Sequence, residues 1–158
     1  MRPPIIGVIG GSEVSPELYS AAELIGREVA TRQAILITGG LRGVMEAAAK
    51  GAKAAGGLTI GVLPGLSPAD ANPYIDLPIV TGLSEARNII IVRTAEVLIA
   101  VGGGYGTLSE IAFALRLQKP VIGLDSWHVA APIIRVQTPQ EAVSRAFALL
   151  DSASSRRP

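Results

Sequence analysis

Short runs of aliphatic residues that end in glycine alternate along this chain with longer segments in which apolar residues recur at helical spacing. The short runs predict β-strands, and the longer segments predict helices that pack on them. We expect strands at residues 5–9, 34–38, 59–63, 79–81, 97–101, 121–124 and 133–136, the last at a sheet edge. We expect helices at residues 16–32, 44–55 and 84–95, and two more that begin at Thr107 and after Thr138.

This alternation is the βαβ rhythm of an α/β protein. It predicts a doubly wound, mostly parallel sheet of about six or seven strands with helices on both faces, which is a Rossmann-like architecture. We expect residues 1–150 to form a single domain and residues 151–158 to be a frayed tail. Four prolines lie within residues 64–78, so we expect no regular element there.

Two segments carry the sequence signature of a helix capping box. Residues 107–110 read Thr-Leu-Ser-Glu, and residues 138–141 read Thr-Pro-Gln-Glu. In such a box the first side chain accepts a hydrogen bond from the fourth residue's amide, and the glutamate reaches back to the first residue's amide. We therefore expect a helix to begin at both places.

The composition supports this fold class and excludes some kinds of functional site. Hydrophobic residues make up 49% of the 158 residues and aromatic residues only 4%, which is typical of strands buried on both faces. Lys and Arg number 14 against 13 Asp and Glu, a net charge of +1, so no excess of basic charge indicates a nucleic-acid partner. The chain has no cysteine, which excludes disulfides, thiolate zinc sites and a cysteine nucleophile.

No segment of the sequence indicates a membrane. The longest apolar runs are shorter than the ~20 residues that span a bilayer, and the N-terminus lacks the regions of a signal peptide. We expect a soluble, cytoplasmic protein with neither a membrane nor a nucleic-acid partner.

Glycines follow three of the predicted strands. The carboxyl ends of parallel strands lie at one edge of the sheet, where such folds bind ligands, and glycine allows a backbone amide to approach an anion. We therefore predict a phosphate site built from Gly10, Gly11, Ser12, Gly39, Gly40, Gly103, Gly104, Tyr105, Gly106 and Thr107. The alternative is that these glycines only make tight turns. Neither a dinucleotide fingerprint after the first strand nor a Walker loop is present.

Few charged residues lie near these turns. Arg42 could bind phosphate or could lie on a solvated surface, and Arg87 is the stronger candidate because its segment is otherwise aliphatic. Glu110 could do chemistry or could only cap its helix. His128 is the single histidine and has no second ligand at metal spacing, so we predict no metal site.

The segment at residues 84–95 is apolar nearly all round, more than one sheet face needs. It predicts burial against a second subunit, and hence a homodimer or homotetramer. The alternative is burial within one subunit beneath residues 64–78.

Residues 103–110, Gly-Gly-Tyr-Gly-Thr-Leu-Ser-Glu, resemble the P-G-G-x-G-T-x-x-E motif of the Lonely Guy (LOG) proteins of the SLOG superfamily, long misnamed lysine decarboxylases. The resemblance covers about residues 5–150 and implies a Rossmann-like domain. In that family the motif glutamate and an upstream arginine hydrolyse the N-glycosidic bond of cytokinin riboside monophosphates. Glu110 and Arg87 match those two residues.

Other positions of the motif resemble a sister branch more closely. Gly102 stands where the LOG proteins have proline, and Ser109 stands where many have a glutamate. Together with Glu85-Ala86-Arg87-Asn88, the motif looks closer to the molybdenum cofactor carrier proteins, which bind and protect a phosphorylated pterin.

Three functions follow from these observations. The first is a binding or carrier protein for a phosphate-bearing ligand, either the molybdenum cofactor or a nucleotide, with no catalytic cofactor. The second is a nucleoside 5′-monophosphate phosphoribohydrolase in which Arg87 and Glu110 are catalytic. The third is a nucleotide-sensing module.

Overall fold

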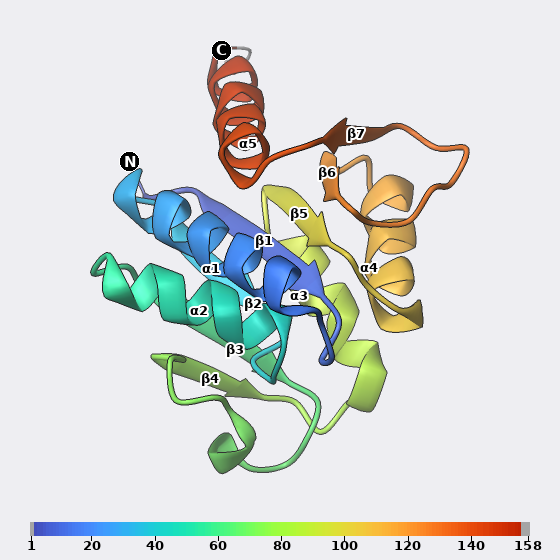
Figure 1. Ribbon diagram of the computed structural model, residues 1–158. Helices are drawn as coiled ribbons and strands as arrows, with labels where there is room; N and C mark the ends of the chain where they lie inside the picture. Colours follow the sequence, from blue (N-terminus) through green and yellow to red (C-terminus); the bar gives the residue numbers. More distant parts are fainter. Residues whose placement is uncertain (1, 156–158) are drawn as a thin grey trace.

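A single parallel sheet organises the chain (Figure 1). Within residues 2–155, the part described by this computed structural model, seven strands pair in the order β4-β3-β2-β1-β5-β6-β7, and every pair is parallel. The strands are β1 (Ile5–Gly10), β2 (Ile35–Thr38), β3 (Thr59–Leu63), β4 (Leu77–Val80), β5 (Val97–Val101), β6 (Val121–Leu124) and β7 (Ile133–Val136). The predicted α/β fold is confirmed, and β7 is an edge strand as expected.

Helices cover both faces of the sheet (Figure 1). Helices α1 (Pro16–Thr31), α2 (Val44–Ala54) and α5 (Pro139–Ser154) contribute to one buried apolar cluster, and α3 (Asn88–Thr94) and α4 (Tyr105–Arg116) contribute to a second. Strand β5 is buried along its whole length, and its side chains alternate between the two clusters. This two-sided burial explains the aliphatic, aromatic-poor composition.

Local side-chain caps start two of these helices. Ser15 Oγ accepts a hydrogen bond from the amide of Leu18 at 3.2 Å, with proline at the first helical position. Thr138 Oγ1 accepts one from the amide of Glu141 at 3.1 Å, while the Glu141 carboxylate accepts one from the amide of Gln137 at 3.0 Å. The second predicted capping box therefore forms its forward bond, and its glutamate binds the amide one residue further upstream.

The structure corrects two predicted stretches. Residues 64–78 are not free of regular structure, since they contain the 3₁₀ turn η1 (Pro68–Asp70) and the start of β4. A proline is tolerated in β4 because the strand lies at the sheet edge, where one side needs no ladder bond. Residues 84–95 begin as the 3₁₀ turn η2 (Ser84–Arg87) before α3, and such tighter turns are common at helix starts.

Beyond residue 150 the chain stays helical. Helix α5 continues to Ser154, so the segment predicted to fray from residue 151 onward is helical over its first four residues. Its end, residues 156–158, lies outside the described residues.

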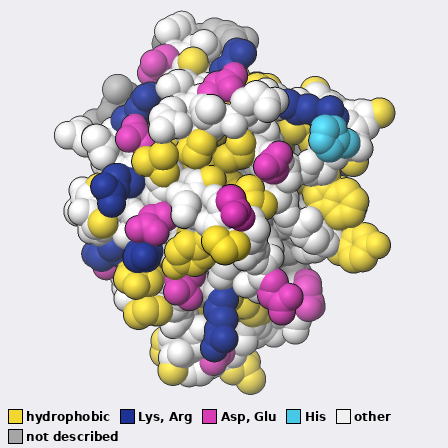
Figure 2. Space-filling model, in the orientation of Figure 1, with side chains coloured by type: hydrophobic (Ala, Val, Ile, Leu, Met, Phe, Trp, Pro, Cys, Tyr) yellow, Lys and Arg dark blue, Asp and Glu magenta, His cyan; other side chains and the backbone are white. Residues whose placement is uncertain are grey.

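None of the helices in residues 2–155 is both long enough and apolar enough to cross a membrane. Acidic and basic side chains are interspersed on the face drawn in Figure 2, as the near-zero net charge suggests.

The connections reverse direction at the centre of the sheet. After β1 the chain builds outward through β2, β3 and β4, and it then returns to place β5 on the other side of β1. This position is the topological switch point of the sheet. In open α/β sheets, ligands bind in a crevice at this point, beyond the carboxyl ends of the strands.

Candidate functional site

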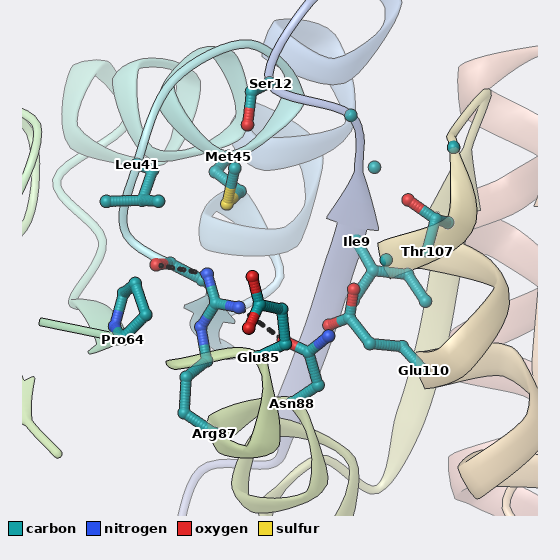
Figure 3. Close-up of a pocket in the computed structure, with 15 residues that line it drawn as sticks. Ile9, Ser12, Leu41, Met45, Pro64, Glu85, Arg87, Asn88, Thr107 and Glu110 are labelled. Atoms are coloured by element: carbon teal, nitrogen blue, oxygen red, sulfur yellow. Dashed lines mark hydrogen bonds between the residues drawn. The ribbon is translucent and has the colours of Figure 1, made fainter. Parts of the chain in front are cut away.

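A cavity of about 320 Å³ lies at this switch point (Figure 3). The turns after β1, β2 and β5 reach its wall, together with η2 and the first turns of α2 and α4. Its lining residues are Ile9, Gly10, Gly11, Ser12, Gly39, Leu41, Met45, Pro64, Glu85, Arg87, Asn88, Gly104, Gly106, Thr107 and Glu110.

Most of the residues singled out from the sequence lie in this wall. The structure brings together Gly10, Gly11, Ser12, Gly39, Arg87, Gly104, Gly106, Thr107 and Glu110. Four others lie outside it. Gly40 packs against Leu63, and Gly103, with a φ of +116°, packs against Thr107. Tyr105 is 83% exposed, and Arg42 lines a neighbouring cavity.

Arg87 is held in place by three hydrogen bonds. Its Nε donates to the carbonyl oxygen of Val62 at 2.8 Å, one terminal nitrogen donates to that of Gly39 at 3.3 Å, and the other donates to Asn88 Oδ1. The side chain is only 8% exposed, and this burial lowers the pKa of Arg87. A rigid positive charge therefore lies against the turn that follows β2.

Asn88 and Ser109 extend this arrangement to α4, although neither was predicted as a site residue. Asn88 Nδ2 donates to Ser109 Oγ at 3.1 Å, and Ser109 Oγ donates to the carbonyl oxygen of Gly106 at 2.6 Å. The signal for Asn88 was present in the sequence, because it is a polar residue in an otherwise aliphatic segment. Arg87 is thereby linked through side chains to the first turn of α4.

Glu110 does not cap its helix, contrary to one of the two explanations left open by the sequence. Helix α4 begins at Tyr105 with Gly104 as its N-cap, two residues earlier than predicted, so Glu110 falls in the second turn. No side chain caps this end of α4. Glu110 is instead 7% exposed in the cavity wall. Burial raises its pKa to about 8, against an opposing effect of the Arg87 charge.

The first amides of α4 are available to a ligand. The amide of Leu108 donates to the carbonyl oxygen of Gly104 at 3.1 Å, but those of Tyr105, Gly106 and Thr107 have no partner within the described part of the chain. Such amides at a helix start favour an anion. A Cβ atom at Gly104 or Gly106 would meet nothing within 4 Å, so these glycines face open space.

Gly10 has a different reason to be glycine. A Cβ atom there would lie 2.6 Å from the carbonyl oxygen of Val101 and from the side chain of Val44. Packing therefore requires glycine at this position whether or not a ligand binds. Close packing at Gly10 and open space at Gly104 thus distinguish two roles for glycine in one wall.

Trp127 contacts the glycine turn that precedes α4. Its Nε1 donates to the carbonyl oxygen of Gly104 at 3.0 Å, and its ring stacks on Tyr105 with centroids 5.9 Å apart. No local pattern predicts this contact, which joins residues 23 positions apart. The neighbouring His128 is exposed, and residues 2–155 contain no group of three or more His, Asp or Glu side chains that could hold a metal ion.

Comparison with known proteins places this geometry in context. The profile of the SLOG cluster4 family matches residues 3–150. The molybdenum cofactor binding protein of Rippkaea orientalis is 39% identical, with a TM-score of 0.90, over 95% of this chain and 99% of that one. The molybdenum cofactor carrier protein of Chlamydomonas reinhardtii is 40% identical, with a TM-score of 0.88 and the same coverage. A cytokinin riboside 5′-monophosphate phosphoribohydrolase of Mycobacterium tuberculosis is 32% identical over 73% of this chain and 67% of its own length.

Proposed function

Since this chain belongs to the SLOG cluster4 family, we propose that it is a carrier that binds the molybdenum cofactor, a phosphorylated pterin, in the cavity at the switch point. Two solved structures with TM-scores of 0.88 and 0.90 support the proposal, because their proteins bind or carry this cofactor and align over 99% of their length. The cavity volume of about 320 Å³ lies within the range of small-molecule sites.

The observation that carries the proposal is the state of the buried carboxyl group. With a pKa raised to about 8 by burial, Glu110 is mainly protonated at neutral pH. A neutral carboxyl group does not repel an anionic ligand, and it can donate a hydrogen bond to it. The cavity can therefore accept a phosphorylated molecule without a charge conflict at this residue.

The chain supplies two further features for anion binding. The free amides at the start of α4 suit an oxyanion, either a phosphate or the oxygen atoms bound to the metal. Arg87 contributes a positive charge that is already ordered, so binding costs no rotamer entropy at that side chain. Both are binding features, and neither requires a bond in the ligand to break.

The alternative function is a phosphoribohydrolase, and one observation favours it. Glu110 and Arg87, which match the catalytic residues of the LOG proteins, line the same cavity, and the relative from Mycobacterium tuberculosis has that activity in its name. In this mechanism the Glu110 carboxylate would steady the developing positive charge at the ribose or activate water. Its raised pKa predicts that such activity would increase as the pH rises toward 8.

One experiment separates the two functions. The purified protein is titrated anaerobically with isolated molybdenum cofactor, and in parallel it is incubated with a panel of nucleoside 5′-monophosphates while released base is followed by chromatography. A carrier gives stoichiometric binding without base release, and Glu110→Gln keeps that binding. Base release that disappears in Glu110→Gln but persists in Asp151→Asn, a change on the exposed side of α5, would establish the hydrolase instead.

A further inference from the structure

A second cavity adjoins the first. Its volume is about 530 Å³, and its wall includes Arg42, Glu46 and Asp70. Ser12 and Leu41 line both cavities, so the two spaces share a boundary. Met45 and Glu46 are consecutive residues in the first turn of α2, and each lines a different cavity. A ligand that filled both spaces would lie across Ser12 and Leu41.

The second cavity offers a cation that is not engaged in an ion pair within the described residues. Arg42 is exposed, and it forms no hydrogen bond or ion pair with any other residue in the described part of the chain. Its planar fork of donors suits a phosphate group. This contrasts with Arg87 in the first cavity, three of whose five N–H donors bond to two carbonyl oxygens and an amide oxygen.

The other polar groups of this cavity are acceptors. The carboxylates of Glu46 and Asp70 accept hydrogen bonds but cannot attract a phosphate, so they suit hydroxyl or amino groups of an uncharged ring system. This cavity thus combines a cation that can bind a phosphate with carboxylates that can accept hydrogen bonds from hydroxyl groups. A nucleoside monophosphate carries both kinds of group. The first cavity would hold the pterin end of the same ligand.

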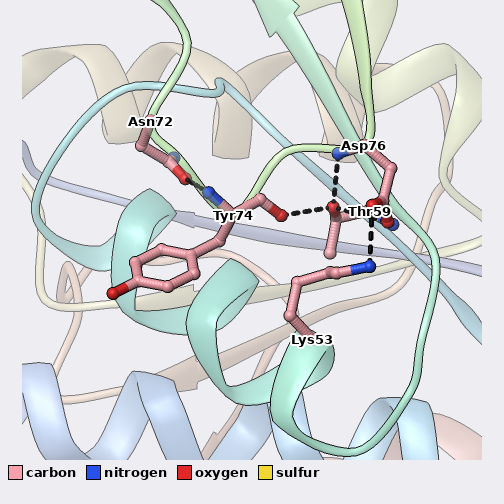
Figure 4. A network of polar contacts seen from close by, with 5 residues as sticks. All are labelled: Lys53, Thr59, Asn72, Tyr74 and Asp76. Carbon is pink, nitrogen blue, oxygen red and sulfur yellow. Dashed lines mark hydrogen bonds and ion pairs between the residues drawn. The ribbon is translucent and has the colours of Figure 1, made fainter.

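Hydrogen bonds hold the Leu41 side of the shared boundary, and Figure 4 shows the part of this network that continues from Asn72 through Tyr74 to Thr59. The Asn72 side chain is 8% exposed and donates to the carbonyl oxygens of Gly40 at 3.2 Å and Leu41 at 2.7 Å. Asn72 Oδ1 in turn accepts from the amide of Tyr74 at 3.0 Å, and the Tyr74 carbonyl oxygen accepts from Thr59 Oγ1 at 2.6 Å. The turn that separates the cavities is thus ordered before any ligand arrives.

We propose that the two cavities form one extended site for a pterin dinucleotide, in which a pyrophosphate crosses the Ser12–Leu41 boundary and Arg42 binds the phosphate of the nucleotide half. This inference rests on the proposed carrier function and adds the class of ligand. It makes Arg42 a specificity residue that distinguishes the extended form of the cofactor from the short one.

The test compares two ligands on three proteins. Dissociation constants are measured for the molybdenum cofactor and for the same cofactor extended through a pyrophosphate by guanosine. The extended form should bind about tenfold more tightly, equivalent to about 1.4 kcal/mol, and Arg42→Gln should abolish that preference while leaving the affinity for the short form unchanged. Arg145→Gln, an exposed change on α5, should keep the preference.

The outcomes separate the inference from the function. Equal affinity for both forms, or a preference that survives in Arg42→Gln, would overturn the extended site while the carrier function stands. Failure of both forms to bind would overturn the carrier function and this inference with it.

Discussion

The guanidinium group of Arg87 and the carboxyl group of Glu110 line the same cavity, yet no ion pair joins them in the described part of the chain. Burial lowers the pKa of Arg87 and raises that of Glu110 to about 8, and each charge opposes the effect of burial on the other. Desolvation therefore outweighs their attraction. The balance leaves one fixed cation and one carboxyl group that titrates just above neutral pH.

The raised pKa of Glu110 predicts that stability falls as the pH rises. Between the ordinary value of 4.5 and about 8 the folded state keeps a proton that the unfolded state loses, so unfolding releases a proton. The free energy of unfolding then decreases with pH, by at most about 1.4 kcal/mol per pH unit from this group. Glu110→Gln should remove that slope. Urea unfolding of both proteins at about pH 5, 6.5 and 8 should show the variant gaining stability over the wild type as the pH rises, and a constant difference would contradict the prediction.

Replacement of Arg87 should lower the free energy of unfolding even when the positive charge is kept. In Arg87→Lys a single ammonium group cannot reproduce the three directed bonds, which leaves the carbonyl oxygens of Val62 and Gly39 without this donor. We expect a loss of about 3 kcal/mol in the free energy of unfolding. Arg93→Lys, an exposed change on the following helix α3, serves as the control and should stay within about 0.5 kcal/mol of the wild type.

A methyl group at Gly106 should weaken ligand binding without harming the fold. The Cβ atom would meet no protein atom within 4 Å, and alanine favours the helix. The methyl group would, however, stand where a ligand must approach the free amides of α4. We expect Gly106→Ala to keep or raise the melting temperature and to weaken cofactor binding about fivefold, or about 1 kcal/mol, by direct titration. Unchanged affinity would mean that the ligand does not approach this turn.

The single tryptophan should report occupancy of the site. Trp127 is the only tryptophan in the sequence, and its Nε1 is bonded to Gly104 in the cavity wall. Cofactor binding should therefore change its fluorescence emission in a saturable manner.

Trp127→Phe tests whether this bond also matters for binding. The variant removes the hydrogen bond to Gly104 but keeps an aromatic ring beside Tyr105, and it should weaken binding by about 1 kcal/mol. Equal affinity of variant and wild type would show that Trp127 is a reporter only.

We also propose that the protein is a homodimer or homotetramer. Ile91 and Val92 of α3 are buried within one subunit, in the apolar cluster that includes strand residues of the sheet, but Ile89 and Ile90 are only half-buried. Phe113 of the neighbouring α4 is 39% exposed, which adds to the apolar area on this side. Size-exclusion chromatography with light scattering should give at least twice the 16.3 kDa chain mass, and a monomer would refute the proposal.

Much of this architecture could be read from the sequence because it depends on local patterns. Buried parallel strands appear as short aliphatic runs, and the glycines after residues 9, 38 and 101 mark the ends of three of them. Those patterns led to the sheet and to nine residues of the cavity wall. The strand order, with β1 beside β5, was not read from them, because pairing depends on contacts between distant segments.

The two capping-box signatures show where local information ends. Thr138 and Thr107 each precede a glutamate by three residues, yet only Thr138 caps a helix. The difference lies in the preceding turn, since Gly104 starts α4 early and carries Glu110 into the second helical turn.

The sequence by itself determined the fold class, the glycine turns and the identity of the charged residues. Only the tertiary structure decided how those residues are held and in which direction their pKa values shift. Arg87 is fastened to carbonyl oxygens 25 and 48 positions away, and Glu110 owes its pKa to burial by surrounding elements. Desolvation depends on all the residues that pack around a group and exclude water from it. The raised pKa of Glu110, on which the proposed function depends, therefore exists only once the chain is folded.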